Sequence, residues 1–140
     1  MNVPNQRIVY LNGEFVPESE AKIPFRDRGV KFGDAVFDTT RTFGHEIFRL
    51  REHLERFYRS LKYLRIDAGM TIEEFIAVTE HVVERNLPLI GKDEDYWVTQ
   101  RVTLPRYGAT CKEVPVRGEA SSPSFDIKIM RMFYIKEEGQ

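Results

Sequence analysis

The feature that most constrains the fold of this chain is a change of side-chain periodicity near residue 44. From Ala35 to Phe43 successive side chains alternate between two faces, as they do in a strand. One face carries Phe37, Thr39, Arg41 and Phe43, and the other carries Val36, Asp38, Thr40 and Thr42. Gly44-His45 predicts a turn, after which residues 46–49 are expected to return as a partner strand.

The residues after this hairpin predict a helix that starts near Leu50. Apolar side chains recur there at helical spacing and form a single stripe. The stripe consists of Leu50, Leu54, Phe57, Leu61 and Leu64. Thr71 and Glu74 have the spacing of a capping box and predict a second helix, which runs to about Asn86 and stops before Pro88.

The N-terminal part of the chain predicts a hairpin. Asn12-Gly13 is a strong two-residue turn signal, and it joins Arg7–Leu11 to Glu14–Val16. A third short extended segment is expected at Ala21–Ile23, and residues 24–33 are expected to be irregular. Together with the later elements, this pattern predicts an α+β domain with an antiparallel or mixed sheet and two helices packed on it.

The C-terminal part predicts two longer strands, Asp95–Leu104 and Phe125–Ile135. Between them, Pro105–Ser124 has no periodicity, and a loop of that length in a compact domain is unusual unless it binds something or is disordered. We expect residues 1–135 to form one small domain and residues 136–140 to begin a linker or tail.

Composition excludes several classes of protein. The 140 residues are 41% hydrophobic and 31% charged, which is typical of a globular domain. A net charge of −1 argues against nucleic acid or an anionic membrane as the main partner. No apolar run approaches the length of about 18 residues that a membrane span needs, so we expect a cytoplasmic protein. The single cysteine and the absence of Cys/His clusters predict no metal site.

One flank of the first long helix carries the candidate binding residues. His53, Arg56, Ser60 and Tyr63 share this side by the helical period. The guanidinium of Arg56 suits a phosphate, to which it can donate two parallel charge-assisted hydrogen bonds. The alternative is that Arg56 only pairs with a carboxylate of Glu52, Glu55 or Asp38.

The segment VKFGDAVFDTTRTFGHEIFRLREHLER resembles the entrance to the active site of the fold-type IV (class IV) pyridoxal-phosphate aminotransferases. These include branched-chain and D-amino-acid aminotransferases, (R)-selective amine transaminases and aminodeoxychorismate lyase. The resemblance implies that Arg56 binds the phosphate of pyridoxal 5'-phosphate and that His53 orients the helix. It also implies a substrate pocket formed by Phe32, Phe37, Thr39 and Arg41.

The long loop adds a further candidate from the same resemblance. In D-amino-acid relatives a basic residue near this position holds the substrate carboxylate, and Arg106 is the preferred candidate here. Arg101 is the other one, and for both residues a solvated charge is the alternative. Phe32-Gly33 and Thr39 differ from the branched-chain pattern, which has Tyr-Gly and a glycine at these places.

The resemblance covers only the first half of a family enzyme. The lysine that binds the cofactor covalently is expected in a second, larger domain, so no catalytic residue is assigned in this chain, and the chain alone is expected to be inactive. The implied partners are an amino donor, a 2-oxo acid and a second copy in a homodimer. The alternatives are a lyase of the aminodeoxychorismate type and a binding module derived from this fold.

Overall fold

The computed structural model describes residues 7–25, 27–104 and 128–134, the last of these by their backbone. In this part of the chain six strands form one sheet in the order β2-β1-β6-β5-β3-β4, and every neighbouring pair is antiparallel. The strands are β1 (Ile8–Leu11), β2 (Glu14–Pro17), β3 (Ala35–Phe43), β4 (Glu46–Ile47), β5 (Tyr96–Thr103) and β6 (Lys128–Tyr134). The predicted α+β class with an antiparallel sheet is therefore confirmed.

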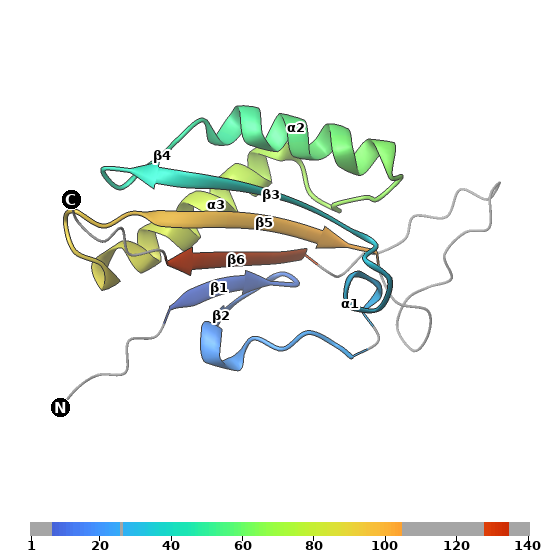
Figure 1. The fold of residues 1–140 in the computed structure, drawn as a ribbon, viewed down its shortest axis with the longest axis horizontal. Helices are drawn as coiled ribbons and strands as arrows, with labels where there is room; N and C mark the ends of the chain where they lie inside the picture. The colour runs from blue at the N-terminus through green and yellow to red at the C-terminus, as the bar shows by residue number, and fades with distance from the viewer. Residues whose placement is uncertain (1–6, 26, 105–127, 135–140) are drawn as a thin grey trace.

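Two long helices pack against this sheet, as expected. They are α2 (Leu50–Tyr63) and α3 (Ile72–Asn86), and the short helices are α1 (Arg28–Phe32), η1 (Glu18–Glu20) and η2 (Leu87–Leu89). Figure 1 shows α3 behind the sheet and α2 along the edge formed by β3 and β4, while no described helix lies in front of the sheet. One face of the sheet is thus covered by helix, and no described helix covers the other.

The alternation predicted for residues 35–43 is confirmed, and it orients the core. On β3 and β5 the even-numbered side chains face the helices, and Tyr96 and Val98 are fully buried. The helical stripe packs against them, with Leu54 0% and Phe57 1% exposed. Each such side chain contributes about 1.5–3 kcal/mol by leaving water. Leu64 is the exception, because it is the C-terminal cap of α2 and is 48% exposed.

Two local sequence signals, the hairpin turn and the helix capping box, are confirmed. Asn12 and Gly13 have φ values of 52° and 95°, as a two-residue hairpin turn requires, and the β1–β2 register pairs Leu11 with Glu14. Thr71 accepts a hydrogen bond from the Glu74 amide, and the Glu74 carboxylate accepts one from the Thr71 amide. The capping box therefore starts α3 as the sequence predicts.

One expectation for residues 21–33 is wrong. Ala21 has extended backbone angles, φ −67° and ψ 119°, and Ala21–Ile23 forms no sheet strand in the described part of the chain. Part of the segment expected to be irregular, however, forms α1. The Asp27 carboxylate accepts a hydrogen bond from the Val30 amide at 3.0 Å, and Gly33, with a φ of 72°, ends the helix. These are the usual start and stop signals of a helix, on a segment too short to show a period.

The other expected strands are present, but their first and last residues differ from those expected. The strand expected over residues 46–49 is reduced to β4, because Arg49 adopts a left-handed conformation as the N-terminal cap of α2. The strands expected at Asp95–Leu104 and Phe125–Ile135 correspond to β5 and β6. The loop Pro105–Ser124 and the tail 136–140 lie outside the described residues. No described helix is both long enough and apolar enough to cross a membrane.

Candidate functional site

The candidate site is built on α2, whose position is set from both sides. Its apolar stripe is buried against the sheet, and on its outer side Arg51 donates two hydrogen bonds of 2.8 and 2.9 Å to Glu73 of α3. This pair raises the pKa of Arg51 and lowers the pKa of Glu73, chiefly through the hydrogen bonds between them. With its two sides occupied, the flank of α2 that carries His53 and Arg56 faces β3.

Asp38 is the partner of both flank residues. Its side chain is only 4% exposed, and it accepts hydrogen bonds from Arg56 Nε and Nη2 at 2.8 Å each. His53 Nδ1 lies 2.6 Å from Asp38 Oδ1. An ionised carboxylate can only accept, so Nδ1 is the donor in this contact. The buried carboxylate is thus paired with a cation, as a buried charge requires.

The cluster answers one question that the sequence left open. Of the three carboxylates considered for Arg56, Asp38 is the one with which it pairs in the structure. His53 contacts the same carboxylate, and its orienting role stays a prediction. Whether Arg56 also binds a phosphate stays a prediction, and the guanidinium retains a large open surface for it, since the side chain is 60% exposed.

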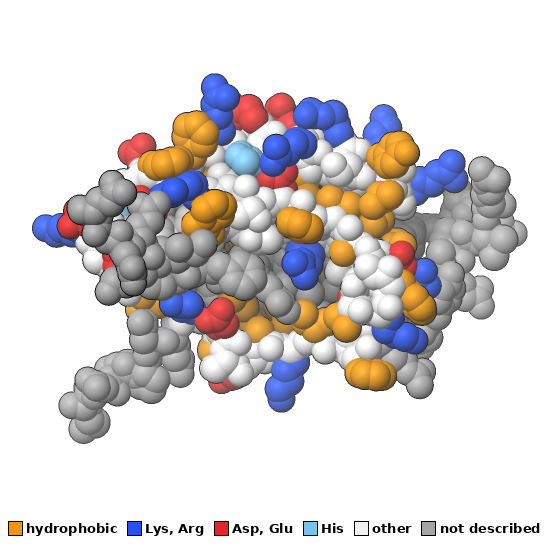
Figure 2. All heavy atoms as spheres, in the orientation of Figure 1, with side chains coloured by type: hydrophobic (Ala, Val, Ile, Leu, Met, Phe, Trp, Pro, Cys, Tyr) orange, Lys and Arg blue, Asp and Glu red, His pale blue; other side chains and the backbone are white. Residues whose placement is uncertain are grey.

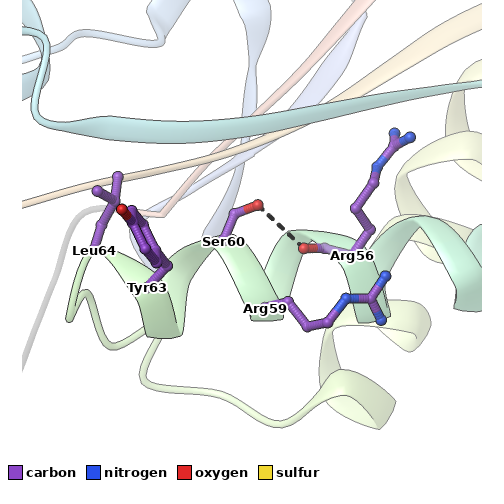
Figure 3. Close-up of a pocket in the computed structure, with 5 residues that line it drawn as sticks. All are labelled: Arg56, Arg59, Ser60, Tyr63 and Leu64. Atoms are coloured by element: carbon purple, nitrogen blue, oxygen red, sulfur yellow. Dashed lines mark hydrogen bonds between the residues drawn. The ribbon is translucent and has the colours of Figure 1, made fainter.

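An open pocket of about 380 Å³ lies beside Arg56 on α2. The pocket is lined by Arg56, Arg59, Ser60, Tyr63 and Leu64. Figure 3 shows Arg56 extending from the helix toward β3, while Arg59 extends to the other side and Ser60 donates a hydrogen bond to the Arg56 carbonyl. Three of the four residues placed on this flank from the sequence therefore line the pocket, and two of its five residues are cationic.

The predicted pocket residues of β3 lie on the open face of the sheet. Phe37 is 64% exposed, and the Arg101 guanidinium lies 5.6 Å from its ring centre. Thr39 Oγ1 is 3.0 Å from Thr99 Oγ1 on the neighbouring strand. The Arg41 guanidinium lies 4.3 Å from the ring centre of Phe43. Figure 2 shows hydrophobic and basic side chains side by side over this face.

Trp97 continues this face on β5. It is opposite Arg41 in the β3–β5 register, and the guanidinium lies 5.7 Å from its ring centre. The open face is therefore a surface of aromatic rings on which guanidinium groups stack, an arrangement in which each cation gains from the ring quadrupole. Asp38 lies on the opposite face of β3, where it pairs with Arg56 and not with Arg41.

The structure does not unite all the predicted site residues in one cavity. Phe32 is the last residue of α1 and is 61% exposed, with Arg28 and Lys31 over its ring. Arg106 lies outside the described residues. Arg56 reaches β3 from the helix-covered side, whereas Phe37 and its neighbours face the open side. The predicted residues thus surround β3 from two sides.

Asp95 forms hydrogen bonds with the C-terminal end of β3 and with the turn that follows it. Its carboxylate accepts hydrogen bonds from Thr42 Oγ1 at 2.6 Å and from the amides of His45 and Gly44 at 3.0 and 3.2 Å. Partial burial would raise the pKa of Asp95, but these hydrogen bonds and the nearby Arg41 guanidinium outweigh it, so the pKa is below its ordinary value. The β3–β4 turn is therefore tied to the start of β5.

Comparison with known proteins decides which family has this arrangement. A model of the amino-transferase class IV family matches residues 35–113, the segment that contains β3, α2, α3 and β5. The chain belongs to the class IV aminotransferase family. It is 40% identical over 78 residues to a D-alanine aminotransferase of Staphylococcus haemolyticus. It is 42% identical over 78 residues to a putative branched-chain-amino-acid aminotransferase of Methanocaldococcus jannaschii.

These matches cover 56% of this class IV chain but only 28% and 27% of the two relatives. Solved structures of branched-chain aminotransferases have the same fold. One from Thermoproteus uzoniensis, solved with norvaline, has a TM-score of 0.65 and 25% identity, covering 92% of this chain and 41% of that one. One from Escherichia coli has a TM-score of 0.70 at 21% identity, over 93% of this chain and 41% of that one. The fold is thus that of the small domain of class IV aminotransferases.

Sequence reasoning identified the flank of α2 but missed the importance of Asp38. The alternation on β3 already placed Asp38 on the same face as Val36 and Thr40, which the apolar stripe of α2 must cover. A carboxylate on a covered face needs a cationic partner, so the position of Asp38 on this face could have identified it as the partner of Arg56. Among the described residues, no group of three or more His, Cys, Asp or Glu side chains could hold a metal ion.

Proposed function

We propose that this domain works in a pyridoxal-phosphate-dependent aminotransferase that transfers an amino group between an amino acid and a 2-oxo acid. The observation that supports it best is Arg56, a guanidinium held from behind by a buried carboxylate and open to solvent in front, beside a pocket. A planar cation with an open edge fits a phosphate monoester. Membership in the class IV family supplies the reaction type, and one solved branched-chain aminotransferase of this fold holds pyridoxamine 5'-phosphate.

In this proposal Arg56 binds the phosphate group and thereby fixes one end of the cofactor. Pyridoxal 5'-phosphate, when bound, supplies the electron sink on which amino-group transfer depends. Ser60, one turn further along α2, lines the same pocket and offers a hydroxyl as a second polar group beside the guanidinium. The residues of this chain therefore bind and orient the cofactor, and they perform no proton transfer.

The open face of the sheet supports an amino acid as the substrate rather than a simple amine. Phe37 and Trp97 provide apolar surface, and Arg41 and Arg101 provide cations that suit a carboxylate. The two curated relatives are named for D-alanine and for branched-chain amino acids, both of which carry a carboxylate. Phe32, Thr39 and Arg106 remain the proposed additional contacts of the substrate side chain and carboxylate.

The chain by itself is proposed to lack turnover. Among the described residues that line the pocket none is a lysine, and the chain spans 41% of the solved Thermoproteus uzoniensis enzyme. A lysine amine is needed to hold the cofactor covalently and to move the proton. Mass analysis after addition of pyridoxal phosphate and borohydride tests this, because one stable adduct on a lysine of this chain would contradict it. A homodimer in the cytoplasm is the assembly and location proposed for the whole enzyme.

The decisive experiment measures the affinity for pyridoxal phosphate in the natural protein that contains this chain. Replacement Arg56→Ala is expected to weaken binding roughly tenfold to a hundredfold, which corresponds to about 1.5–3 kcal/mol for one charge-assisted contact. Arg51→Ala is the matched control, because Arg51 lies on the same helix and is also ion-paired, but it points toward α3. Equal affinity in the wild type and Arg56→Ala would contradict the proposed role of Arg56.

A further inference from the structure

We infer that Asp38 is a positioning residue that presents one particular edge of the Arg56 guanidinium to a phosphate. The inference rests on the proposed function and deepens it, because it names the group that orients Arg56 for a phosphate. Asp38 touches neither cofactor nor substrate in this scheme. It acts through Arg56, and His53 in turn acts through Asp38.

The hydrogen-bond geometry identifies which edge is used. A guanidinium has two edges on which two N–H groups are parallel, one formed by Nε and Nη2 and the other by Nη1 and Nη2. Asp38 occupies the first, with Nε donating to Oδ2 and Nη2 to Oδ1, each at 2.8 Å, while Nη2 also lies 2.7 Å from Oδ2. Within the described part of the chain no hydrogen bond involves Nη1. The second edge is therefore the one that remains for a ligand.

Burial restricts the motion of the Asp38 carboxylate. Asp38 lies in the middle of β3, where its backbone is paired with Gln100 of β5, and its side chain is 4% exposed. His53 Nδ1, at 2.6 Å from Oδ1, occupies a further acceptor position of the carboxylate and limits its rotation. Arg56 Nη2 is also 3.2 Å from His53 Nδ1, so the three side chains are in mutual contact.

The same rigidity has a consequence for binding. An exposed arginine loses rotamer freedom when it binds an anion, and this loss weakens the affinity. Because Asp38 already restricts the guanidinium of Arg56, less freedom remains to be lost. The carboxylate also repels a phosphate, but it lies behind the guanidinium and is paired with it. The inference is that the gain from positioning exceeds this repulsion.

The test compares two ligands that differ only in the phosphate. Affinities for pyridoxal phosphate and for pyridoxal are measured in a cofactor-free preparation of the natural protein that contains this chain. Asp38→Asn is expected to weaken binding of pyridoxal phosphate about two- to tenfold and to leave pyridoxal unchanged. The amide retains the shape of the side chain, but its NH2 group faces an N–H donor of Arg56, so the paired hydrogen bonds cannot both form. Weakening of both ligands alike, or tighter binding of pyridoxal phosphate, would overturn the inference.

A second pair of variants separates positioning from a general effect on the fold. In Arg56→Lys the ammonium has no planar edge to be presented, so adding Asp38→Asn to this variant is expected to change the affinity for pyridoxal phosphate less than about twofold. The same loss in both backgrounds would show that Asp38 acts independently of the guanidinium. Thermal unfolding of each variant confirms that the compared proteins are folded.

A measurement on the wild type needs no variant at Asp38. The Arg56 Nε–H proton, followed by nitrogen-15 NMR with and without inorganic phosphate, is expected to exchange slowly in both states because Asp38 accepts it throughout. Rapid exchange on addition of phosphate would mean that Asp38 releases Arg56, which contradicts positioning.

If Arg56→Ala leaves the affinity for pyridoxal phosphate unchanged, the proposed function fails. If Arg56→Ala weakens it and Asp38→Asn does not, only the present inference fails.

Discussion

Asp38 on β3 and Arg56 on α2 are 18 positions apart, yet the Arg56 guanidinium donates two hydrogen bonds of 2.8 Å to the Asp38 carboxylate. The pair joins the covered face of the sheet to the exposed flank of the helix. Its two members differ sharply in burial, with 4% of the Asp38 side chain and 60% of the Arg56 side chain exposed. Loss of the pair should therefore cost more for the buried carboxylate, which has little access to water, than for the exposed guanidinium.

Arg56→Ala is expected to lower the free energy of unfolding by about 1–2 kcal/mol, because it removes the cation from the buried Asp38 carboxylate and leaves His53 as its remaining side-chain partner. Screening of the exposed guanidinium keeps the effect in this range. Urea denaturation of the purified protein measures it. Arg51→Ala, which breaks an exposed pair with Glu73, is the control and is expected to lower stability less than Arg56→Ala does, because solvent screens this pair. Equal losses in the two variants would show that the burial of Asp38 contributes nothing.

Asp95→Asn is expected to destabilise the protein by about 1–3 kcal/mol, because the amide places a donor against the Gly44 N–H. The pKa of Asp95 is lowered in the folded state, so its contribution is present above the ordinary pKa of about 4 and is lost as the pH falls through the folded value. Unfolding followed from about pH 7 to about pH 2 should therefore show a smaller acid-dependent loss in Asp95→Asn than in the wild type. Parallel curves would contradict this.

Asn86→Ala is expected to cost about 2–4 kcal/mol, because the variant takes away the side-chain partner of the part-buried Ile8 amide and carbonyl and of the Val82 carbonyl. The buried amide of Asn86 accepts a hydrogen bond from the Ile8 N–H and donates to the carbonyls of Ile8 and Val82. Thermal or urea unfolding measures the loss. Glu84→Ala, at an exposed position of the same helix, should change stability by less than about 0.5 kcal/mol. A loss below about 1 kcal/mol in Asn86→Ala would show that water replaces the amide.

Gln100→Met is expected to leave stability unchanged or to raise it by about 1–2 kcal/mol. The Gln100 side chain is fully buried, and neither its oxygen nor its nitrogen has a hydrogen-bond partner among the described residues. A thioether of similar volume removes the desolvation penalty of the amide without leaving a cavity. Urea denaturation decides the outcome. A clear loss of stability would mean that the Gln100 amide has a partner beyond the described residues.

Local patterns made the elements on either side of the candidate site predictable. The alternation of residues 35–43 identifies both faces of β3, and Thr71 with Glu74 identifies the start of α3. These signals are local because each is a property of neighbouring residues and of one backbone period. Helix α1 was missed for the same reason. At five residues it is too short to show a period, and only its cap residues Asp27 and Gly33 signal it.

Contacts between distant segments were not predictable in the same way. The position of β6 between β1 and β5 pairs residues from the two ends of the chain, and no local pattern states that order. The partner of Arg56 is another example, since Glu52, Glu55 and Asp38 were all within reach on the sequence evidence. Burial decides between them, because a carboxylate covered by α2 needs the cation more than an exposed one does.

By itself the sequence determined the α+β class, the two long helices and the flank of α2 on which Arg56 lies, because hydrophobic period and capping are encoded in consecutive residues. Only the tertiary structure decided that Asp38 and His53 hold Arg56, and that the face of β3 with Phe37, Thr39 and Arg41 is the one that no described helix covers. That assignment depends on how α2 packs along β3, and this packing is set by the whole core rather than by any one segment.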